Sequence, residues 1–166
     1  TIIQRLQDMF RKNRKQSDSF QLDDLVRFTA DISRARLRKA GIELRLQLNA
    51  PTAFSFTPGE LEHVLMNLLN NAIQALQEVQ KAERWIEIST WENAERTYLA
   101  VSDSGPGIPE DLQQKIFDLS ESGTSSRGMG LGLWLAHYIV ERHHGTLSID
   151  TRYESGSRFI VECPRV

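Results

Sequence analysis

The amino-acid sequence predicts an α+β fold, a two-layer sandwich with helices on one face of a mixed, largely antiparallel sheet. Segments with apolar residues at helical spacing are interspersed with shorter segments in which apolar and polar residues alternate. Two pairs of the strand-like segments are joined by short polar turns, which is typical of antiparallel hairpins. The 166 residues suffice for one such domain with a short extension.

The first residues predict a short helical stub ahead of the main domain. Ile3, Leu6 and Phe10 recur at helical spacing and form one apolar stripe, so the stub is expected to face a partner. A polar stretch, residues 13–19, ends this helix.

A second helix is expected to begin near the two carboxylates at 23–24 and to run to about Ala40. Carboxylates in a first turn complement the helix dipole, and Gly41 suits the position after a helix C-terminus. Residues 42–48 alternate strictly and predict a half-buried strand. A short strand at 54–56 is expected in the connection that follows.

The next helix, expected over 59–81, carries polar groups along the edge of its apolar stripe. The stripe consists of Leu61, Leu65, Leu68, Ala72 and Leu76. His63, Asn67 and Asn71 follow one another at a spacing of four along its edge. An amide at a core boundary must be hydrogen-bonded or coordinated. The pair therefore either caps loops or binds Mg²⁺, which takes few protein oxygens and otherwise keeps phosphate and water.

Two strands, 85–91 and 97–102, predict a hairpin whose second strand ends in a carboxylate. Leu99, Val101 and Asp103 alternate onto one face of that strand. A carboxylate on a buried face is costly unless it meets a donor, so Asp103 indicates a bound partner.

Two glycine clusters flank a polar segment of about twenty residues. In the first, D-S-G-P-G-I, Gly105 and Gly107 let backbone approach a partner closely. In the second, G-M-G-L-G-L, Gly128, Gly130 and Gly132 lead into a helix whose free N–H groups form an anion site. Such glycines also occur in ordinary turns, but both clusters in this order are far rarer.

The two clusters together describe a nucleotide pocket, with a base at the carboxylate and phosphates at the glycine-rich helix start. The segment between them, about 116–127, would be a mobile lid because it is polar and holds few apolar residues. A short helix at 109–117 is expected to precede it, with proline near its first position. The helix after the lid, 131–144, is expected to end at Gly145, before a closing hairpin.

The composition and charge of the chain disfavour several classes of function. A net charge of -2 gives no whole-protein argument for nucleic acid, and the basic groups at 11–15 and 34–39 are typical of solvated helix faces. The single cysteine, Cys163, excludes an internal disulfide and fits a reducing compartment. Adjacent His143 and His144 point apart on a helix, which disfavours a metal site there. No apolar run is long enough to span a membrane.

Four motifs match, in their order, those of one known family. The stretch E-L-E-H-V-L-M-N-L-L-N-N-A, residues 60–72, resembles an N box, and the two glycine clusters resemble the first and second glycine boxes. Residues 156–159, G-S-R-F, resemble the G-x-G-T-x-F ending. The family is that of the sensor histidine kinases, within the wider gyrase, heat-shock chaperone, kinase and mismatch-repair ATPase fold. The resemblance implies an ATP-binding catalytic domain over 20–166. Residues 1–19 then resemble the tail of a dimerisation and phosphoacceptor helix with its linker.

The resemblance also implies roles for single residues. Asn71 would coordinate Mg²⁺, and Asn67 would lie beside the phosphates as a candidate catalytic residue together with His63. Asp103 would accept from the adenine amino group, and Ser157 would stand near the adenine end. The other cofactor-binding residues implied are Gly105, Gly107, Ile108, Gly128, Gly130, Leu131 and Gly132.

Three departures from the family pattern stand out. The F box should continue from Phe117 to a second aromatic residue, and 118–121 offer none, which leaves the anchoring of the lid open. Gln74 stands where lysine is frequent, so one phosphate contact is missing. Thr57 replaces the aspartate that usually opens the N box.

The implied activity is transfer of the ATP γ-phosphoryl group to a histidine on an upstream dimerisation domain, for relay to a response regulator receiver domain. The implied partners are ATP, Mg²⁺, that dimerisation domain in the same or a partner chain, and the receiver domain, with no nucleic acid. The full-length protein is expected to be a homodimer. The expected location is the cytoplasm, as a separate protein or as the cytoplasmic part of a membrane-anchored sensor.

Two alternatives remain at this point. One is an ATP-hydrolysing clamp of the same superfamily, but such ATPases carry a glutamate as general base where this chain has Asn67. The other is a nucleotide-binding regulatory module without transfer activity, which the thin F box permits.

Overall fold

A computed structural model describes residues 19–79, 83–118 and 130–165 of the chain. The elements, in chain order, are β1 (Ser19–Gln21), α2 (Leu22–Lys39), β2 (Glu43–Leu48), β3 (Ala53–Ser55), α3 (Pro58–Gln77), β4 (Trp85–Glu92), β5 (Arg96–Asp103), α4 (Glu110–Gln113), α6 (Gly130–Arg142), β6 (Thr146–Ile149) and β7 (Ser157–Pro164). The predicted helical stub and the second glycine cluster's Gly128 lie outside the described residues.

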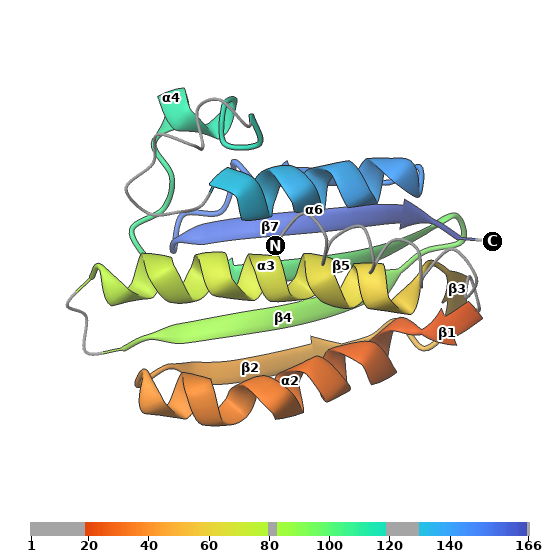
Figure 1. Ribbon diagram of the computed structural model, residues 1–166, viewed down its shortest axis with the longest axis horizontal. Helices are drawn as coiled ribbons and strands as arrows, with labels where there is room; N and C mark the ends of the chain where they lie inside the picture. The colour runs from red at the N-terminus through yellow and green to blue at the C-terminus, as the bar shows by residue number, and fades with distance from the viewer. Residues whose placement is uncertain (1–18, 80–82, 119–129, 166) are drawn as a thin grey trace, which may run out of the picture.

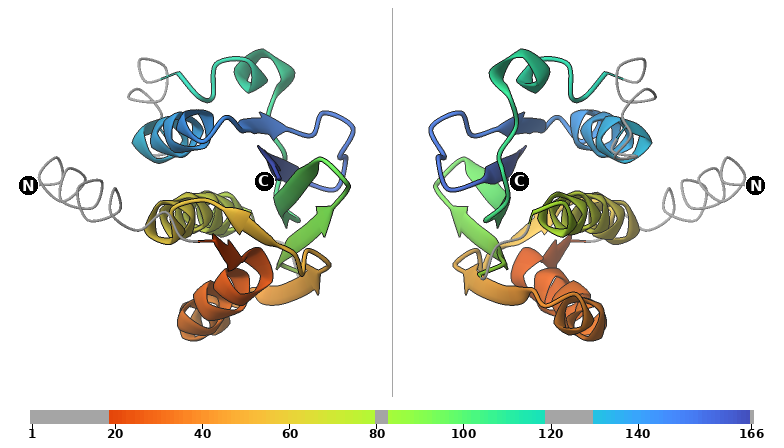
Figure 2. Two further views of the ribbon diagram at one scale, coloured as in Figure 1. Left: turned by 90° about the vertical axis from the view of Figure 1, so that its right-hand side faces the viewer. Right: turned by 90° about the vertical axis from the view of Figure 1, so that its left-hand side faces the viewer.

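A five-stranded sheet forms one layer, in the order β2-β4-β5-β7-β6. Its β2 and β4 run parallel, and its other neighbours are antiparallel. The helices α2, α3 and α6 lie side by side on one face, and Figures 1 and 2 show the other face without a helix. Short β1 and β3 pair separately. The predicted two-layer sandwich with a mixed, largely antiparallel sheet is confirmed.

The core lies between the helix layer and the sheet. The predicted stripe of α3 is buried along its whole length, and Pro58 opens the helix, where its missing N–H costs nothing. The α2 carboxylate Asp23 has a further role, because it is buried. It accepts from the Ala50 N–H at 3.1 Å and the Thr90 hydroxyl at 2.6 Å, which joins α2 to β4. Burial raises the pKa of the Cys163 thiol to about 12.

Several predicted boundaries are wrong by a few residues. α3 ends at Gln77 rather than near 81, because Gln77 and Glu78 are exposed and the buried stripe stops at Leu76. The short strand β3 lies one residue earlier than expected, as its pairing with β1 requires.

The helix predicted over 109–117 is only α4. Tight turns follow it, in which the Lys115 N–H bonds to Leu112 and the Asp118 N–H to Lys115. Ile116 is buried within these turns.

The helix before the last hairpin ends at Arg142, two residues earlier than predicted. His144, with φ 62°, takes the left-handed position expected for Gly145. Gly145 is needed for space instead, since a Cβ there would lie 2.6 Å from the Glu162 carbonyl oxygen. None of the described helices is both long and apolar enough to cross a bilayer.

Candidate functional site

Asp103 ends β5 inside the protein, with 1% of its surface exposed. The antiparallel register sets it opposite Ser157, the first residue of β7. Its Oδ1 accepts from the Gly105 N–H at 2.8 Å and from the Ser157 N–H at 3.4 Å. At the neighbouring Gly156 a Cβ would fall 2.0 Å from the Asp103 carbonyl oxygen, so only glycine fits there. The predicted burial of this carboxylate is therefore confirmed, with donors supplied by the chain's own backbone, and the bound partner expected there stays a prediction.

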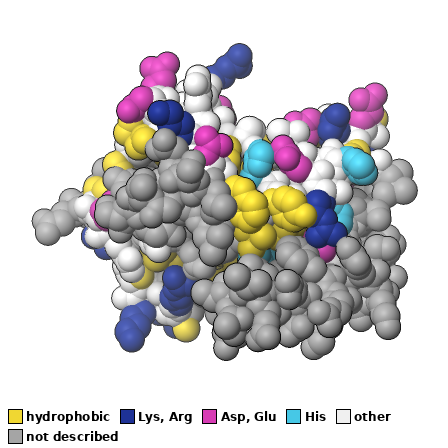
Figure 3. Space-filling model, turned by 45° about the horizontal axis from the view of Figure 1, so that its top comes forward, with side chains coloured by type: hydrophobic (Ala, Val, Ile, Leu, Met, Phe, Trp, Pro, Cys, Tyr) yellow, Lys and Arg dark blue, Asp and Glu magenta, His cyan; other side chains and the backbone are white. Residues whose placement is uncertain are grey.

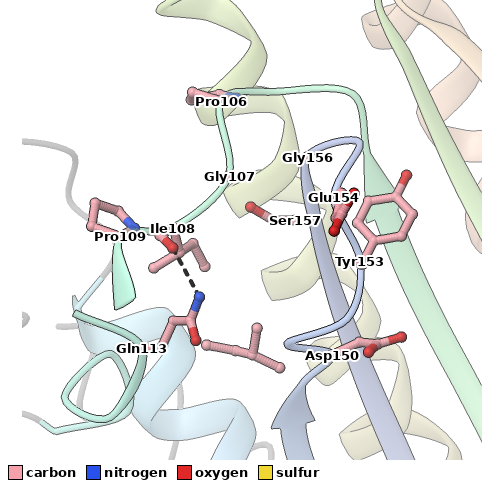
Figure 4. A pocket seen from close by; sticks show the side chains of 11 residues that line it. Pro106, Gly107, Ile108, Pro109, Gln113, Asp150, Tyr153, Glu154, Gly156 and Ser157 are labelled. Carbon is pink, nitrogen blue, oxygen red and sulfur yellow. Dashed lines mark hydrogen bonds between the residues drawn. The ribbon is translucent and has the colours of Figure 1, made fainter. Parts of the chain in front are cut away.

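A cavity of about 380 Å³ lies beside this carboxylate. Gly107, Ile108 and Ser157, all predicted to bind the cofactor, line it (Figure 4). Its volume falls within the range of small-molecule sites. Asn67, Asn71 and Asp103 are not among its lining residues, so the cavity adjoins the carboxylate rather than enclosing the whole predicted site.

The far wall of the cavity is the connection between β6 and β7, with Asp150, Tyr153 and Glu154. Among the described residues, no lysine, arginine or histidine lines the cavity. Burial raises the pKa of the Tyr153 phenol, and the nearby Asp103 carboxylate raises it further. This acidic end is unsuited to phosphate, which agrees with phosphates lying elsewhere.

The amide pair of α3 lies where the sequence predicts. Asn71 is buried, and its Oδ1 has no hydrogen-bond partner among the described residues. Asn67 Nδ2 is likewise buried without a partner there. Buried polar atoms are normally paired, so two orphans one turn apart are available to hydrogen-bond or coordinate a ligand.

Helix α3 brings the two halves of the predicted site together. At one end, a Cβ built on Gly132 of α6 would lie 3.6 Å from Asn67 Oδ1. At the other end, a Cβ built on Gly105 would lie 3.4 Å from the Ala75 Cβ. Asn67 and Ala75 are about 12 Å apart along the helix, with Asn71 midway. The first glycine cluster and the start of α6 thus flank the amide pair.

The remaining predicted residues are placed less fully. His63 is half-buried one turn before Asn67, and burial lowers the pKa of its imidazole, which favours the neutral ring at pH 7. Gly130 and Leu131 begin α6, although their side chains are not described. Gly128 and most of the predicted lid lie outside the described residues.

Sequence reasoning missed the side chains that hold the cavity wall in place. Gln113 Nε2 donates to the Ile108 carbonyl oxygen at 2.9 Å. Phe117 stacks on His137 and meets Phe159 edge-on. The Gln113 bond spans only five residues, whereas the Phe117 contacts join segments far apart in the chain, so no local pattern could reveal those.

Known proteins resemble this chain in sequence and in fold. A family model described as histidine kinase-, DNA gyrase B- and HSP90-like ATPase matches residues 56–166. The circadian input-output histidine kinase CikA of Synechococcus elongatus is 33% identical over 87% of this chain, and the match spans only 20% of CikA.

Solved structures are similar over nearly the whole described domain. The catalytic domain of histidine kinase ThkA has 30% identity and a TM-score of 0.79, with 90% of this chain and 96% of that chain covered. ThkA in complex with the response regulator protein TrrA has 26% identity and a TM-score of 0.75, with 99% of this chain and 48% of that chain covered. The chain therefore belongs to the histidine kinase-, DNA gyrase B- and HSP90-like ATPase family and, within it, to the ATP-binding catalytic domains of histidine kinases.

Proposed function

We propose that this domain transfers the γ-phosphoryl group of ATP to a histidine on a dimerisation domain outside the described residues. The observation that carries the proposal is the orphaned amide pair, Asn67 and Asn71, next to the glycine-rich start of α6. Phosphoryl transfer relies on positioning and charge neutralisation more than on covalent chemistry. A buried amide pair beside a helix N-terminus can supply both.

The residues fit a Mg²⁺ ion bound together with the nucleotide. Asn71 Oδ1 is a buried oxygen without a hydrogen-bond partner among the described residues, and Mg²⁺ takes a few such oxygens. Asn71 would hold the ion, which neutralises phosphate charge when bound. Asn67 would orient the phosphates from one turn earlier, beside Gly132.

The adenine end of the proposed site is at Asp103. Its carboxylate is buried, and no basic side chain of the described residues lines the cavity beside it. Ile108 and Ser157 would contact the base, and Gly105 and Gly107 would let the backbone approach it. The second cluster, Gly128 to Gly132 with Leu131, would take the phosphates.

Hydrolysis of ATP is the less favoured reaction. An amide at Asn67 cannot take a proton from water, unlike the glutamate of related hydrolases. Burial lowers the pKa of His63 and so keeps its ring neutral, with a nitrogen available to accept a proton, although the same shift makes it a weaker base. It remains a candidate catalytic residue, one helical turn further from the start of α6 than Asn67.

The acceptor histidine is proposed to lie on another domain. Two of the chain's histidines already pair with glutamates, His137 with Glu141 and His143 with Glu60. A homodimeric dimerisation domain would present the acceptor, and the likeness to the ThkA–TrrA complex supports a response regulator downstream. The proposed location is the cytoplasm.

Labelled ATP tests this proposal. The chain is incubated with γ-labelled ATP and Mg²⁺, alone and with a separate polypeptide that carries an acceptor helix from a histidine kinase. Acid-labile label is expected on the acceptor only, and slowly, since effective concentration is lost without a covalent link. Label on this chain alone would contradict the proposed division of labour. Equal ADP release with and without the acceptor would indicate a hydrolase, and ATP binding without either product a regulatory module.

A further inference from the structure

The segment that follows β5, residues 104–118, supplies one wall of the cavity but is held to the rest of the domain by few contacts. It extends to Asp118 and forms no ladder with the sheet, and α4 is its only helix. Figure 1 shows α4 on the far side of α6 from α3. Within the segment, Gln113 holds the Ile108 carbonyl, and Ile116 is buried. The position of the wall therefore depends on what holds the segment's far end.

Phe117 holds this end of the segment, because its ring packs between the rings of His137 and Phe159. Its ring meets Phe159 edge-on, with centroids 6.2 Å apart and an interplanar angle of 77°. It stacks on His137 of α6, with centroids 5.0 Å apart and an angle of 19°. Phe159 is 2% exposed and lies two residues after Ser157 on the same face of β7. The ring of Phe159 is thus fixed in the core.

His137 packs on the other side of Phe117, from a partly exposed position on α6. Its side chain is 31% exposed, and its Nε2 lies 3.3 Å from Glu141 Oε1, one turn further along α6. His137 does not line the cavity and is not among the residues proposed to contact nucleotide.

We propose that His137 is a positioning residue for the nucleotide. Its ring clamps Phe117 against Phe159 and so fixes the segment that places Ile108 and Gln113 in the cavity wall. The inference rests on the proposed nucleotide site. Since an aromatic pair contributes beyond its buried area, loss of the stack should weaken Mg-ATP binding about two- to tenfold.

Three substitutions separate stacking from the contact with Glu141. His137→Ala removes both, His137→Phe keeps a flat ring without that contact, and Glu141→Gln keeps the ring and removes the carboxylate. Calorimetry with Mg-ATP should give weaker binding for His137→Ala and near-unchanged binding for the other two. Tyr138→Ala is the control. That neighbour is 46% exposed and stacks on Trp134 rather than on Phe117. Figure 3 shows one face of the molecule, where hydrophobic side chains gather.

A rate measurement distinguishes positioning from general damage to the fold. With the separate acceptor polypeptide, His137→Ala should raise the KM for ATP and leave the rate at saturating ATP unchanged. The proposal would be overturned if His137→Ala bound Mg-ATP with the Kd of the unsubstituted chain, or if His137→Phe bound it as weakly as His137→Ala.

Amide hydrogen exchange tests the contact between His137 and Phe117 independently of nucleotide binding. In the nucleotide-free chain, His137→Ala should speed exchange over 108–117 relative to the Tyr138→Ala control. If the unsubstituted chain binds no ATP, the proposed function fails. Faster exchange would then still support the clamp, and unchanged exchange would overturn it.

Discussion

Asp103 is the residue that decides the expected choice of base. Its buried carboxylate is fixed by the N–H groups of Gly105 and Ser157. A carboxylate accepts from the amino group of adenine, whereas guanine presents a carbonyl at that position, so acceptor would face acceptor. The site should therefore prefer ATP to GTP.

Asp103→Asn tests this assignment with little change in shape. The amide keeps an oxygen for the two backbone donors but removes the negative charge that would bind the amino group. A hydrogen bond to a charged group contributes roughly 1.5–3 kcal/mol, so ATP binding should weaken about ten- to a hundredfold. Calorimetry measures the change, with the exposed Asp31→Asn on α2 as control. Equal affinity of the unsubstituted chain for ATP and GTP would refute the assignment.

Asn71→Ala tests the proposed metal ligand. Asn71 Oδ1 has no hydrogen bond in the part of the chain described, so its removal should shift the melting temperature by less than about 4 °C. The dependence of ATP binding on Mg²⁺ should disappear.

The adjacent Asn70→Ala is the matched control for Asn71→Ala. Asn70 accepts from Arg36 of α2 and points away from the predicted site, so its loss should leave Mg-ATP binding intact. If Asn71→Ala unfolds the domain, or binds Mg-ATP as before, Asn71 is a packing residue and not a ligand.

At the scale of elements, α3 and α6 are joined at the end remote from the glycine clusters. The Glu60 carboxylate, in the first turn of α3, has a side chain only 3% exposed and lies 3.0 Å from His143 Nε2. The His143 ring also stacks on Phe56 at 3.7 Å, and Arg142 approaches the same carboxylate at 3.8 Å. This cluster fixes the relative position of the two helices that carry the amide pair and Gly132.

His143→Ala should destabilise the domain, because it leaves a buried carboxylate short of a donor. The expected loss is about 1–3 kcal/mol in the free energy of unfolding, measured by urea denaturation. The double variant Glu60→Gln with His143→Ala should lose less free energy of unfolding than the sum of the losses in the two single variants. Strict additivity would mean that the two side chains are not coupled.

The sequence predicts most elements because their signals are local. The α3 stripe, the β4–β5 hairpin and the alternation in β2 depend on neighbours a few residues apart. The short extent of α4 was not predictable in the same way. It depends on where Ile116 and Phe117 must pack, against residues distant in the chain.

At the scale of the whole molecule, the site forms where three non-adjacent parts of the chain meet over one face of the sheet. The glycine clusters and amides were predictable as separate motifs, since residue type and spacing reveal them. Their convergence on α3 was expected only through the family resemblance. The parallel pairing of β2 with β4 and the clamp at Phe117 needed the structure, because each joins residues far apart in sequence.

The orientation of the nucleotide along α3 is the central claim, and amide chemical shifts from NMR test it most directly. Adenosine should shift the Gly105 and Ser157 amides and leave Gly132 unchanged, because it has a base and no phosphates. Mg-ATP should shift all three, and Asn71→Ala should abolish the Mg²⁺-dependent part at Gly132. Adenosine shifts at Gly132 with none at Gly105, or ATP shifts confined to the helix-free face of the sheet, would contradict the account.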